Sequence, residues 1–198
     1  MKLKRAYQFR FYPDQQQEKL LAQTFGCVRY VYNSILRYRI DSYYESKENI
    51  SYVAASAKLT SIKKLPELAF LNEVSSVPLQ QSLRHQQTAF KNFFQGRAKY
   101  PTFRSKNDKQ SAEFTLSAFT FKKGELRLAK CDKPLDIKWS RKLPSDPSTV
   151  TISKDPAGRY FVSCLCEFEP TSLPTTTKKV GIDLGIKESV LNIVDDPK

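Results

Sequence analysis

The stretch Val180-Gly181-Ile182-Asp183-Leu184-Gly185-Ile186-Lys187 carries the most specific pattern in this chain of 198 residues. Large apolar residues alternate with Gly181, Asp183 and Gly185, which is the period of a β-strand. One face is apolar, and the other presents a single carboxylate between two glycines, where a metal ion and a phosphate have room to approach. Acidic side chains hold pairs of Mg²⁺ ions against a scissile phosphate in this way. One Asp cannot hold two ions, so the residues that would complete such a site are not evident.

The charge of the chain points to a polyanionic partner. Lys and Arg number 33 against 20 Asp and Glu, a net charge of +13. The excess is uneven, because residues 1–110 hold 19 basic and 8 acidic residues, whereas residues 111–198 hold 14 and 12. A basic first part with interleaved aromatic residues favours nucleic acid over a soluble surface that is merely rich in Lys.

The sequence gives no sign of a membrane segment or of an oxidised, secreted protein. No apolar run approaches the roughly 18 residues that span a bilayer, and Met1-Lys2-Leu3-Lys4-Arg5 is not followed by a signal-peptide core. The four cysteines show no C-x-x-C spacing: Cys27, Cys131, Cys164 and Cys166. We expect an intracellular protein without membrane contact, a disulfide or a zinc site.

The first part of the chain has the apolar spacing of helices. Four are expected, with these approximate bounds: 15–25, 27–44, 52–65 and 79–94. Asp14 and Ser51 are expected to be N-caps, and Gly26 and Gly96 are expected to end helices. His85, the only histidine, lies on the fourth helix. We expect it to be an ordinary surface or groove residue and not a catalytic base.

The chain becomes basic and aromatic from residue 91 to residue 109. The basic residues expected to contact a nucleic-acid backbone, one of them outside this stretch, are Arg29, Lys91, Arg97, Lys99, Arg104, Lys106 and Lys109. Such a stretch can neutralise phosphates while its aromatic rings stack on bases. The alternative is a solvated loop between two subdomains.

After residue 110 the apolar period changes to two, which indicates short strands. Asp155-Pro156-Ala157-Gly158 is a strong turn sequence inside a hairpin. The lone strand before Pro13 needs partners, and the nearest are those after residue 110. We therefore expect an α+β fold in which a small β-barrel is interrupted by a helical insertion. The expected parts are residues 1–13 with 110–170 for the barrel, 14–109 for the insertion, 171–179 for a linker and 180–198 for the start of another domain.

Several segments, in this order and over nearly the whole chain, resemble one known family. They are Phe11-Tyr12-Pro13, residues 26–33, 77–83, 89–94 and 100–106, Val150-Thr151-Ile152-Ser153 with Gly158-Arg159-Tyr160, and Gly181 to Lys187. Together they resemble the TnpB (OrfB) family of transposon-encoded RNA-guided DNA endonucleases, relatives of the type V CRISPR effectors.

The resemblance implies a wedge-like barrel split by a helix-turn-helix-like recognition lobe, then the first strands of an RNase H-like (RuvC) nuclease domain. Asp183 matches the first of three metal-binding acids of that domain, so it would be both catalytic and a metal ligand. The other two acids and a zinc ribbon lie further along the family's chains. Mg²⁺ is expected for the complete family enzyme, weakly bound or absent here, and no zinc is expected. Asp195 and Asp196 suit a hairpin loop better than a ligand position.

The resemblance also implies the partners. These are a guide RNA from the transposon end and duplex DNA next to the target, in the cytoplasm and nucleoid of a prokaryote. The positions matching segments that line the duplex are Tyr52, Ser56, Ser76, Gln80, Phe114 and Thr115. Hydroxyls and amides can contact base edges or phosphates. The alternatives are core packing for Tyr52 and Phe114, and helix capping for Ser76 and Gln80.

The resulting prediction is a truncated family member that binds guide RNA and target-adjacent DNA but does not cut alone, with a separately encoded C-terminal half as a further candidate partner. The alternative is an RNA-dependent DNA-binding repressor or binding subunit without nuclease activity. A phosphotransferase or chaperone ATPase is disfavoured, because Ile186-Lys187 follows the glycine-rich motif where those proteins have Thr or Ser.

Overall fold

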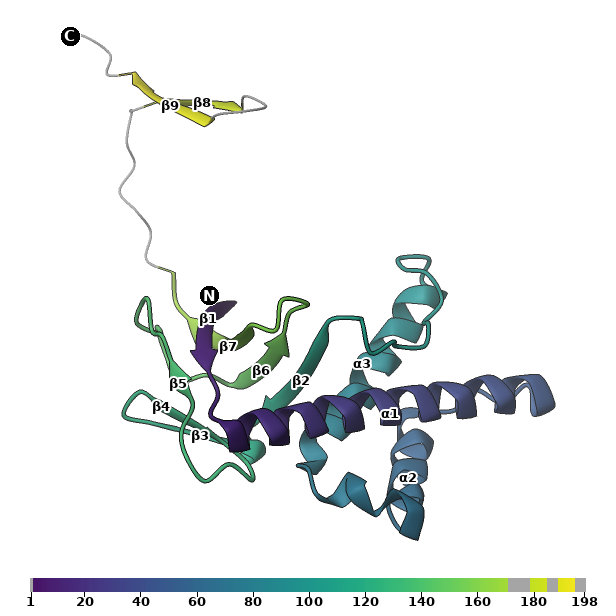
Figure 1. Ribbon diagram of the computed structural model, residues 1–198. Helices are drawn as coiled ribbons and strands as arrows, with labels where there is room; N and C mark the ends of the chain where they lie inside the picture. The colour runs from purple at the N-terminus through teal and green to yellow at the C-terminus, as the bar shows by residue number, and fades with distance from the viewer. Residues whose placement is uncertain (1, 171–178, 185–188, 195–198) are drawn as a thin grey trace. The chain divides into compact units, whose positions relative to one another are not determined.

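The computed structural model describes residues 2–170, 179–184 and 189–194 (Figure 1). They divide into two compact units, one of residues Lys2–Phe168 and one from Glu169 onward. The first unit begins with β1 (Leu3–Tyr12), α1 (Gln15–Ser46), α2 (Tyr52–Ile62), the 3-10 segment η1 (Pro66–Asn72) and α3 (Ser76–Phe94). It continues with β2 (Gln110–Thr115), η2 (Leu116–Ala118), β3 (Phe119–Lys122), β4 (Glu125–Leu128), β5 (Asp136–Ile137), β6 (Thr149–Lys154) and β7 (Tyr160–Phe168).

Five strands form one antiparallel sheet in the order β2-β6-β7-β1-β5. The lone first strand pairs with β7, from Leu3 opposite Phe168 to Phe11 opposite Tyr160. The prediction that β1 finds its partners after residue 110 is therefore confirmed. The hairpin of β6 and β7 turns at the predicted sequence, where Gly158 has a φ of +80° and its N–H donates to the Asp155 carbonyl at 3.0 Å.

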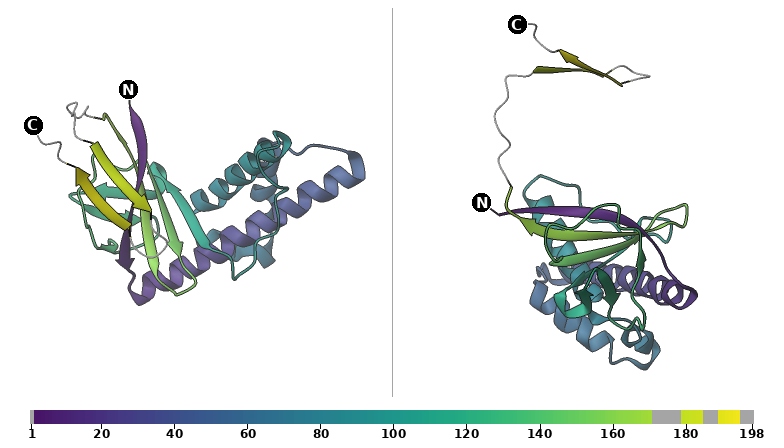
Figure 2. Two further views of the ribbon diagram at one scale, coloured as in Figure 1. Left: turned by 90° about the horizontal axis from the view of Figure 1, so that it is seen from above. Right: turned by 90° about the vertical axis from the view of Figure 1, so that its left-hand side faces the viewer.

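The expected closed barrel is not seen among the described residues. The sheet is open, with β2 and β5 at its edges, and β3 and β4 form a separate hairpin (Figure 2). The Leu135 N–H donates to the Leu126 carbonyl at 2.8 Å, so the hairpin lies next to the chain entering β5. However, β5 has only two paired residues and follows Pro134, which has no N–H. Such a short strand cannot carry the continuous ladder that closes a barrel.

The prediction that Gly26 ends the first helix is wrong, because α1 is one helix of 32 residues. It begins at the expected N-cap with a capping box, in which the Asp14 side chain accepts from the Gln17 N–H at 2.9 Å and the Gln17 side chain accepts from the Asp14 N–H at 3.2 Å. Phe25 and Cys27 are buried on either side of Gly26. Packing of the helix against its neighbours before and after Gly26 outweighs the low helix propensity of one glycine.

The ends of the other helices follow local signals. Ser51 caps α2 by accepting from the Ala54 N–H at 3.2 Å, as predicted. Ser75 caps α3, which begins three residues before the expected Leu79. At the end of α3 the Gly96 N–H donates to the Phe93 carbonyl and the Arg97 N–H to the Asn92 carbonyl, both at 2.9 Å. Gly96 has a φ of +69°, so this is a Schellman stop at the predicted glycine.

The helices and the sheet share one hydrophobic core. Its members come from β1, α1, α2, α3 and the later strands, and include Phe9, Leu21, Val28, Leu59, Leu79, Leu83, Val150 and Val162. Figure 2 shows the helices lying along one side of the sheet. The insertion between β1 and β2 is therefore part of the same packed body.

The second unit contains β8 (Lys179–Leu184) and β9 (Ser189–Val194), which pair antiparallel. The strand expected around Asp183 is present, with Asp183 opposite Val190. The continuation through residues 185–187, most of the expected linker, and Asp195 and Asp196 lie outside the described residues. Among the helices that the structure describes, none is long and apolar enough to cross a membrane.

Candidate nucleic-acid interface

The basic segment, residues 97–109, is fastened to the middle of α1. The Asn33 side chain donates to the Arg104 carbonyl at 3.0 Å and accepts from the Arg104 N–H at 2.8 Å. This pair of bonds satisfies both backbone groups of one residue from a position 71 residues away in the sequence. Asn33 therefore fixes the chain at Arg104, as a cap does at a helix end.

Two stacked pairs reinforce this attachment. The Arg104 guanidinium carbon lies 3.9 Å from the centroid of the buried Tyr32 ring, and that of Arg37 lies 5.6 Å from the centroid of the Phe103 ring. Cation–π contacts at such distances add to the hydrogen bonds. The basic segment is thus attached to α1 at residues 103 and 104, while most of its residues are exposed and lie outside helices and strands. Both interpretations of this segment, a nucleic-acid contact and a solvated loop, stay predictions.

Three of the predicted backbone contacts line one small hollow beside α1. Arg29, Arg104 and Lys109 meet at a hollow of about 20 Å³ next to Phe25. Asp108 also lines it, but its carboxylate accepts from the Ser105 N–H at 2.6 Å. The hollow is lined by basic residues from α1 and from the basic segment, and basic side chains are the usual protein contacts of phosphate oxygens.

The remaining predicted cations lie nearer the end of α3 or on the segment itself. Lys91, on the last turn of α3, is exposed, as are Lys99 and Lys106. Arg97 follows the Schellman stop, and its guanidinium donates to the Gln95 side chain. Exposed basic side chains of this kind can neutralise phosphates and so release counterions from a nucleic acid.

The residues on α2 and α3 that were predicted to contact the duplex are exposed or half-buried. Tyr52 is half-buried at the start of α2, with the Arg84 guanidinium 4.7 Å from its ring centroid. Ser56 is half-buried on the same helix, and Ser76 and Gln80 are exposed on the first turns of α3. Because Ser75 supplies the cap, Ser76 and Gln80 are not used for capping.

The two predicted contacts on β2 differ from each other. Phe114 is 3% exposed and belongs to the hydrophobic core, so its ring does not face solvent. This agrees with the alternative given for Phe114, core packing, and not with a DNA contact. Thr115 is half-buried at the end of the strand, and its hydroxyl lies 3.4 Å from that of Ser117. Only Thr115 of this pair presents polar atoms to a ligand.

His85 is joined to a carboxylate that the sequence places far from it. Its Nε2 lies 2.8 Å from Oε2 of Glu113, which links α3 to β2. The hydrogen bond with His85 lowers the pKa of Glu113 from its ordinary value, burial opposes this, and the charge interaction with His85 adds to the lowering. This pair links α3 to β2, and the prediction that His85 is an ordinary surface or groove residue and not a catalytic base stays a prediction.

The described residues outside the second unit hold no metal site. Among them, no group of three or more His, Cys, Asp or Glu side chains lies close enough to hold an ion. Asp183 is placed only by its strand, β8.

The four cysteines are buried as free thiols, and burial raises the pKa of Cys27 and Cys131 to about 11 and that of Cys164 to about 12. These thiols pack in the interior.

Sequence reasoning missed Tyr32, Asn33 and Arg37. All three lie on α1 and contact the basic segment. None of them was among the residues predicted to contact a nucleic acid. Asn is a poor helix former because its side chain competes for backbone groups. An Asn on the packed face of a long helix was the signal that a backbone segment lies against it.

The comparisons with known proteins agree on one relationship. A family model described as a helix-turn-helix domain, HTH_OrfB_IS605, matches residues 1–48. Two curated proteins named "Putative RNA-guided DNA endonuclease" match most of the chain. The one from Streptomyces pristinaespiralis is 56% identical over 191 residues, covering 95% of this chain and 48% of the relative. InsQ from Escherichia coli K12 is 27% identical over 196 residues, covering 94% and 46%.

Among solved structures, a chain of a Cas12f1–sgRNA–target DNA complex is similar over 98% of this chain and 55% of that one, with 14% identity and a TM-score of 0.46. The chain spans about half the length of the curated relatives that it matches. Within the residues matched by the helix-turn-helix model, the structure has β1 and the single uninterrupted helix α1, without a turn between two helices.

Proposed function

Because the chain belongs to the TnpB (OrfB) family, we propose that its first unit binds nucleic acid through the basic segment and the side of α1 to which that segment is fastened. One observation carries this proposal. The bonds between Asn33 and Arg104 hold a positively charged segment in a fixed place, and a fixed set of cations loses less freedom on binding a phosphate chain than a loose one does.

The partners proposed are an RNA guide from the transposon end and the DNA duplex beside its target. The relatives are named RNA-guided DNA endonucleases, which supports both kinds of nucleic acid. Arg29, Arg104 and Lys109 would contact phosphates. Exposed Ser76 and Gln80 on α3 have the donors and acceptors that read base edges, and Thr115 adds a hydroxyl.

The second unit would contribute to cleavage through Asp183. Phosphodiester hydrolysis of this type needs several carboxylates around a pair of Mg²⁺ ions, which activate water and balance charge at phosphorus. Asp183 would supply one oxygen ligand from β8. We therefore expect these 198 residues alone to bind without cutting, and cleavage that is lost in Asp183→Asn would contradict this expectation.

Binding is tested by titrating the chain with RNA and with duplex DNA at several salt concentrations. For duplex DNA, log K should fall with log[salt] with a slope of about −0.9 for each phosphate contacted. Lys109→Ala is expected to make this slope less steep by about one contact, since Lys109 is exposed and the fold does not depend on its side chain. The absence of binding to either polymer at low salt would contradict the proposal.

Lys122→Ala is the matched control, because Lys122 is exposed on β3 and its substitution removes the same charge as Lys109→Ala does. If Lys122→Ala changes the slope as much as Lys109→Ala does, binding follows net charge and not the surface beside α1. A slope that changes only with Lys109→Ala places a phosphate at the hollow.

A further inference from the structure

A pocket of about 630 Å³ opens where the end of α1, the end of α3 and the start of the basic segment meet. Its walls include Arg39, Tyr43, Phe90, Phe93, Phe94 and Tyr100. The volume is within the range of about 300–1,000 Å³ that small-molecule and cofactor sites have. Neither the hollow beside Arg29 nor the predicted duplex contacts form part of it, so the pocket is a separate feature.

The aromatic rings of the pocket have fixed orientations. The Tyr100 ring is nearly perpendicular to both Phe90, at 5.6 Å between centroids, and Phe93, at 5.1 Å. Phe94 is tilted against Phe93 and roughly parallel to Phe90. Edge-to-face and offset pairs of this kind are favourable arrangements that lock each ring against its neighbours.

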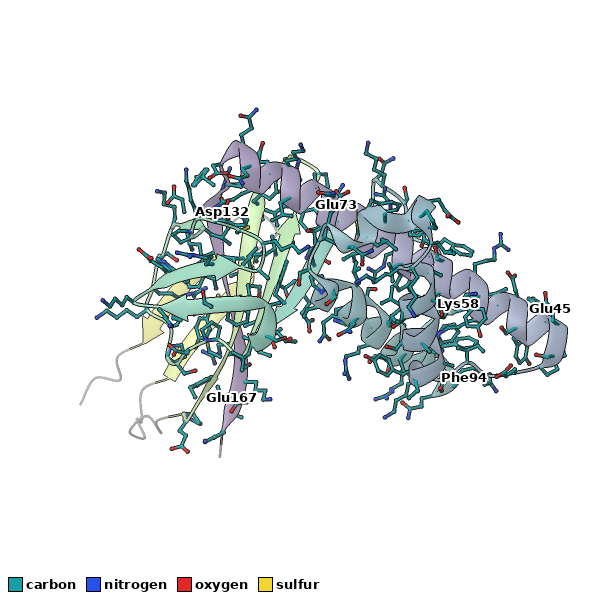
Figure 3. The ribbon with its side chains drawn as sticks, turned by 90° about the horizontal axis from the view of Figure 1, so that it is seen from below. Glu45, Lys58, Glu73, Phe94, Asp132 and Glu167 are labelled. Atoms are coloured by element: carbon teal, nitrogen blue, oxygen red, sulfur yellow. The ribbon has the colours of Figure 1, made fainter. Side chains whose placement is uncertain are left out.

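Three of the aromatic rings that line the pocket are nevertheless open to solvent. Phe94 is 71% exposed, Tyr43 48% and Tyr100 44%. Figure 3 labels Phe94 among the side chains of the helical part of the chain. A cluster of large apolar side chains around an open pocket is a mark of a binding surface, because single exposed hydrophobic residues are common but contiguous ones are not.

The charge around the pocket is mainly positive. Buried Arg39 forms part of its wall, donating to the Ile50 carbonyl at 2.6 Å and to the Gln87 side chain at 2.9 Å, so its cation is fixed. Lys91 also lines the pocket, with Glu48 as its one acidic residue. Lys99 directly precedes Tyr100, which lines the pocket. A neutral apolar peptide would gain nothing from that charge, whereas a nucleotide joins a flat apolar base to a phosphate.

We propose that this pocket holds one unpaired nucleobase of a single-stranded nucleic acid, stacked on Phe94, with the neighbouring phosphates near Lys91 and Lys99. The inference rests on the proposed nucleic-acid binding and assigns a new site within it. Stacking on an aromatic ring tolerates any base, so the pocket selects for an unpaired strand and not for sequence.

The test uses the full chain with single-stranded RNA and DNA oligonucleotides that carry one 2-aminopurine, a base whose fluorescence falls when it stacks. Quenching on binding is expected, and Phe94→Ala should abolish it and weaken single-strand affinity about 10-fold. Phe94→Tyr should restore both. Tyr12→Ala is the matched control, since Tyr12 is 49% exposed on β1 with two cations over its ring, and it should behave as the wild type.

Quenching with RNA, with DNA or with both supports the site and identifies the strand. Equal quenching by a fully paired duplex overturns it. If the chain binds nucleic acid but neither quenches 2-aminopurine nor loses affinity with Phe94→Ala, this inference fails while the proposed function stands. Loss of binding to every polymer at low salt would remove both. An altered oligomeric state of Phe94→Ala with unchanged quenching would make the patch a protein contact and also overturn the site.

Discussion

Long basic side chains act inside this fold as well as on its surface. The Arg39 head bonds to one backbone carbonyl and one amide, and its guanidinium carbon lies 5.3 Å from the Phe90 centroid. Arg104 covers the buried Tyr32 ring. Both residues count toward the formal charge of +13, yet Arg39 cannot contact a phosphate. The surface therefore presents less positive charge than the composition suggests.

The hydrogen bond between His85 and Glu113 gives a prediction for pH. Because the pKa of Glu113 is lowered in the folded state, its carboxylate favours folding at pH values above the ordinary Glu pKa of about 4.3. That contribution is lost as pH falls through the lowered pKa. Glu113→Gln should thus reduce the free energy of unfolding by roughly 0.5 kcal/mol at pH 7, since the pair is partly exposed. The difference from wild type should shrink toward pH 3 in urea unfolding.

Glu125→Gln serves as the control for that experiment, because Glu125 is exposed on β4. It should leave the unfolding free energy close to wild type at both pH values. A Glu113→Gln difference that grows as the pH falls would contradict the assigned direction of the pKa shift.

At the scale of elements, the sequence predicted what depends on neighbours along the chain. The caps at Asp14 and Ser51 and the stop at Gly96 are confirmed because each uses backbone groups within a few residues. The end at Gly26 was wrong because tertiary packing decides whether a helix continues past a glycine. The contact between Asn33 and Arg104 could not be predicted, since it spans 71 residues and exists only after the core has formed.

The same contrast explains the outcome for the candidate site. The basic and hydroxyl residues of the candidate site were chosen by residue type. The alternation of apolar residues along the strand did not say which side of the strand faces the core, and Phe114 lies on that side. The open sheet in place of a barrel has a similar cause. β5 has only two paired residues, although the apolar alternation runs over a longer stretch, so alternation alone does not report how far a strand pairs.

Gly26 offers a test of the continuous helix. No atom lies within 4 Å of a Cβ built at this position, and its φ is not in the left-handed region. Gly26→Ala should therefore raise the free energy of unfolding by about 0.5–1 kcal/mol, because alanine loses less backbone entropy in a helix. Gly96→Ala, also with no atom nearby but with a φ of +69°, should lower it by about 1 kcal/mol. Urea unfolding that gives both substitutions the same sign would contradict the helix bounds.

At the scale of the whole molecule, the first unit has the attributes of an independent folding unit. Its core members extend in sequence from Phe9 to Cys166, and β1 pairs with β7 along most of its length. The sequence order of strand, helices and strands follows the predicted insertion. Because the helices and the sheet bury their apolar faces against each other, neither part would be stable without the other.

A chain ending at Phe168 should therefore keep the fold and the nucleic-acid surface. We expect its thermal midpoint to lie within about 2 °C of the full chain, because a domain of this size shifts by roughly 2–4 °C for each 1 kcal/mol, and every core member is retained. Its salt slope with duplex DNA should also be unchanged, since Arg29, Arg104 and Lys109 all remain. A chain ending at Lys154 is the control, because it lacks β7, the strand between β1 and β6, and should not fold. A large fall in the midpoint of the longer fragment, or loss of its DNA affinity with the fold intact, would mean that residues after 168 contribute to the body or to the interface.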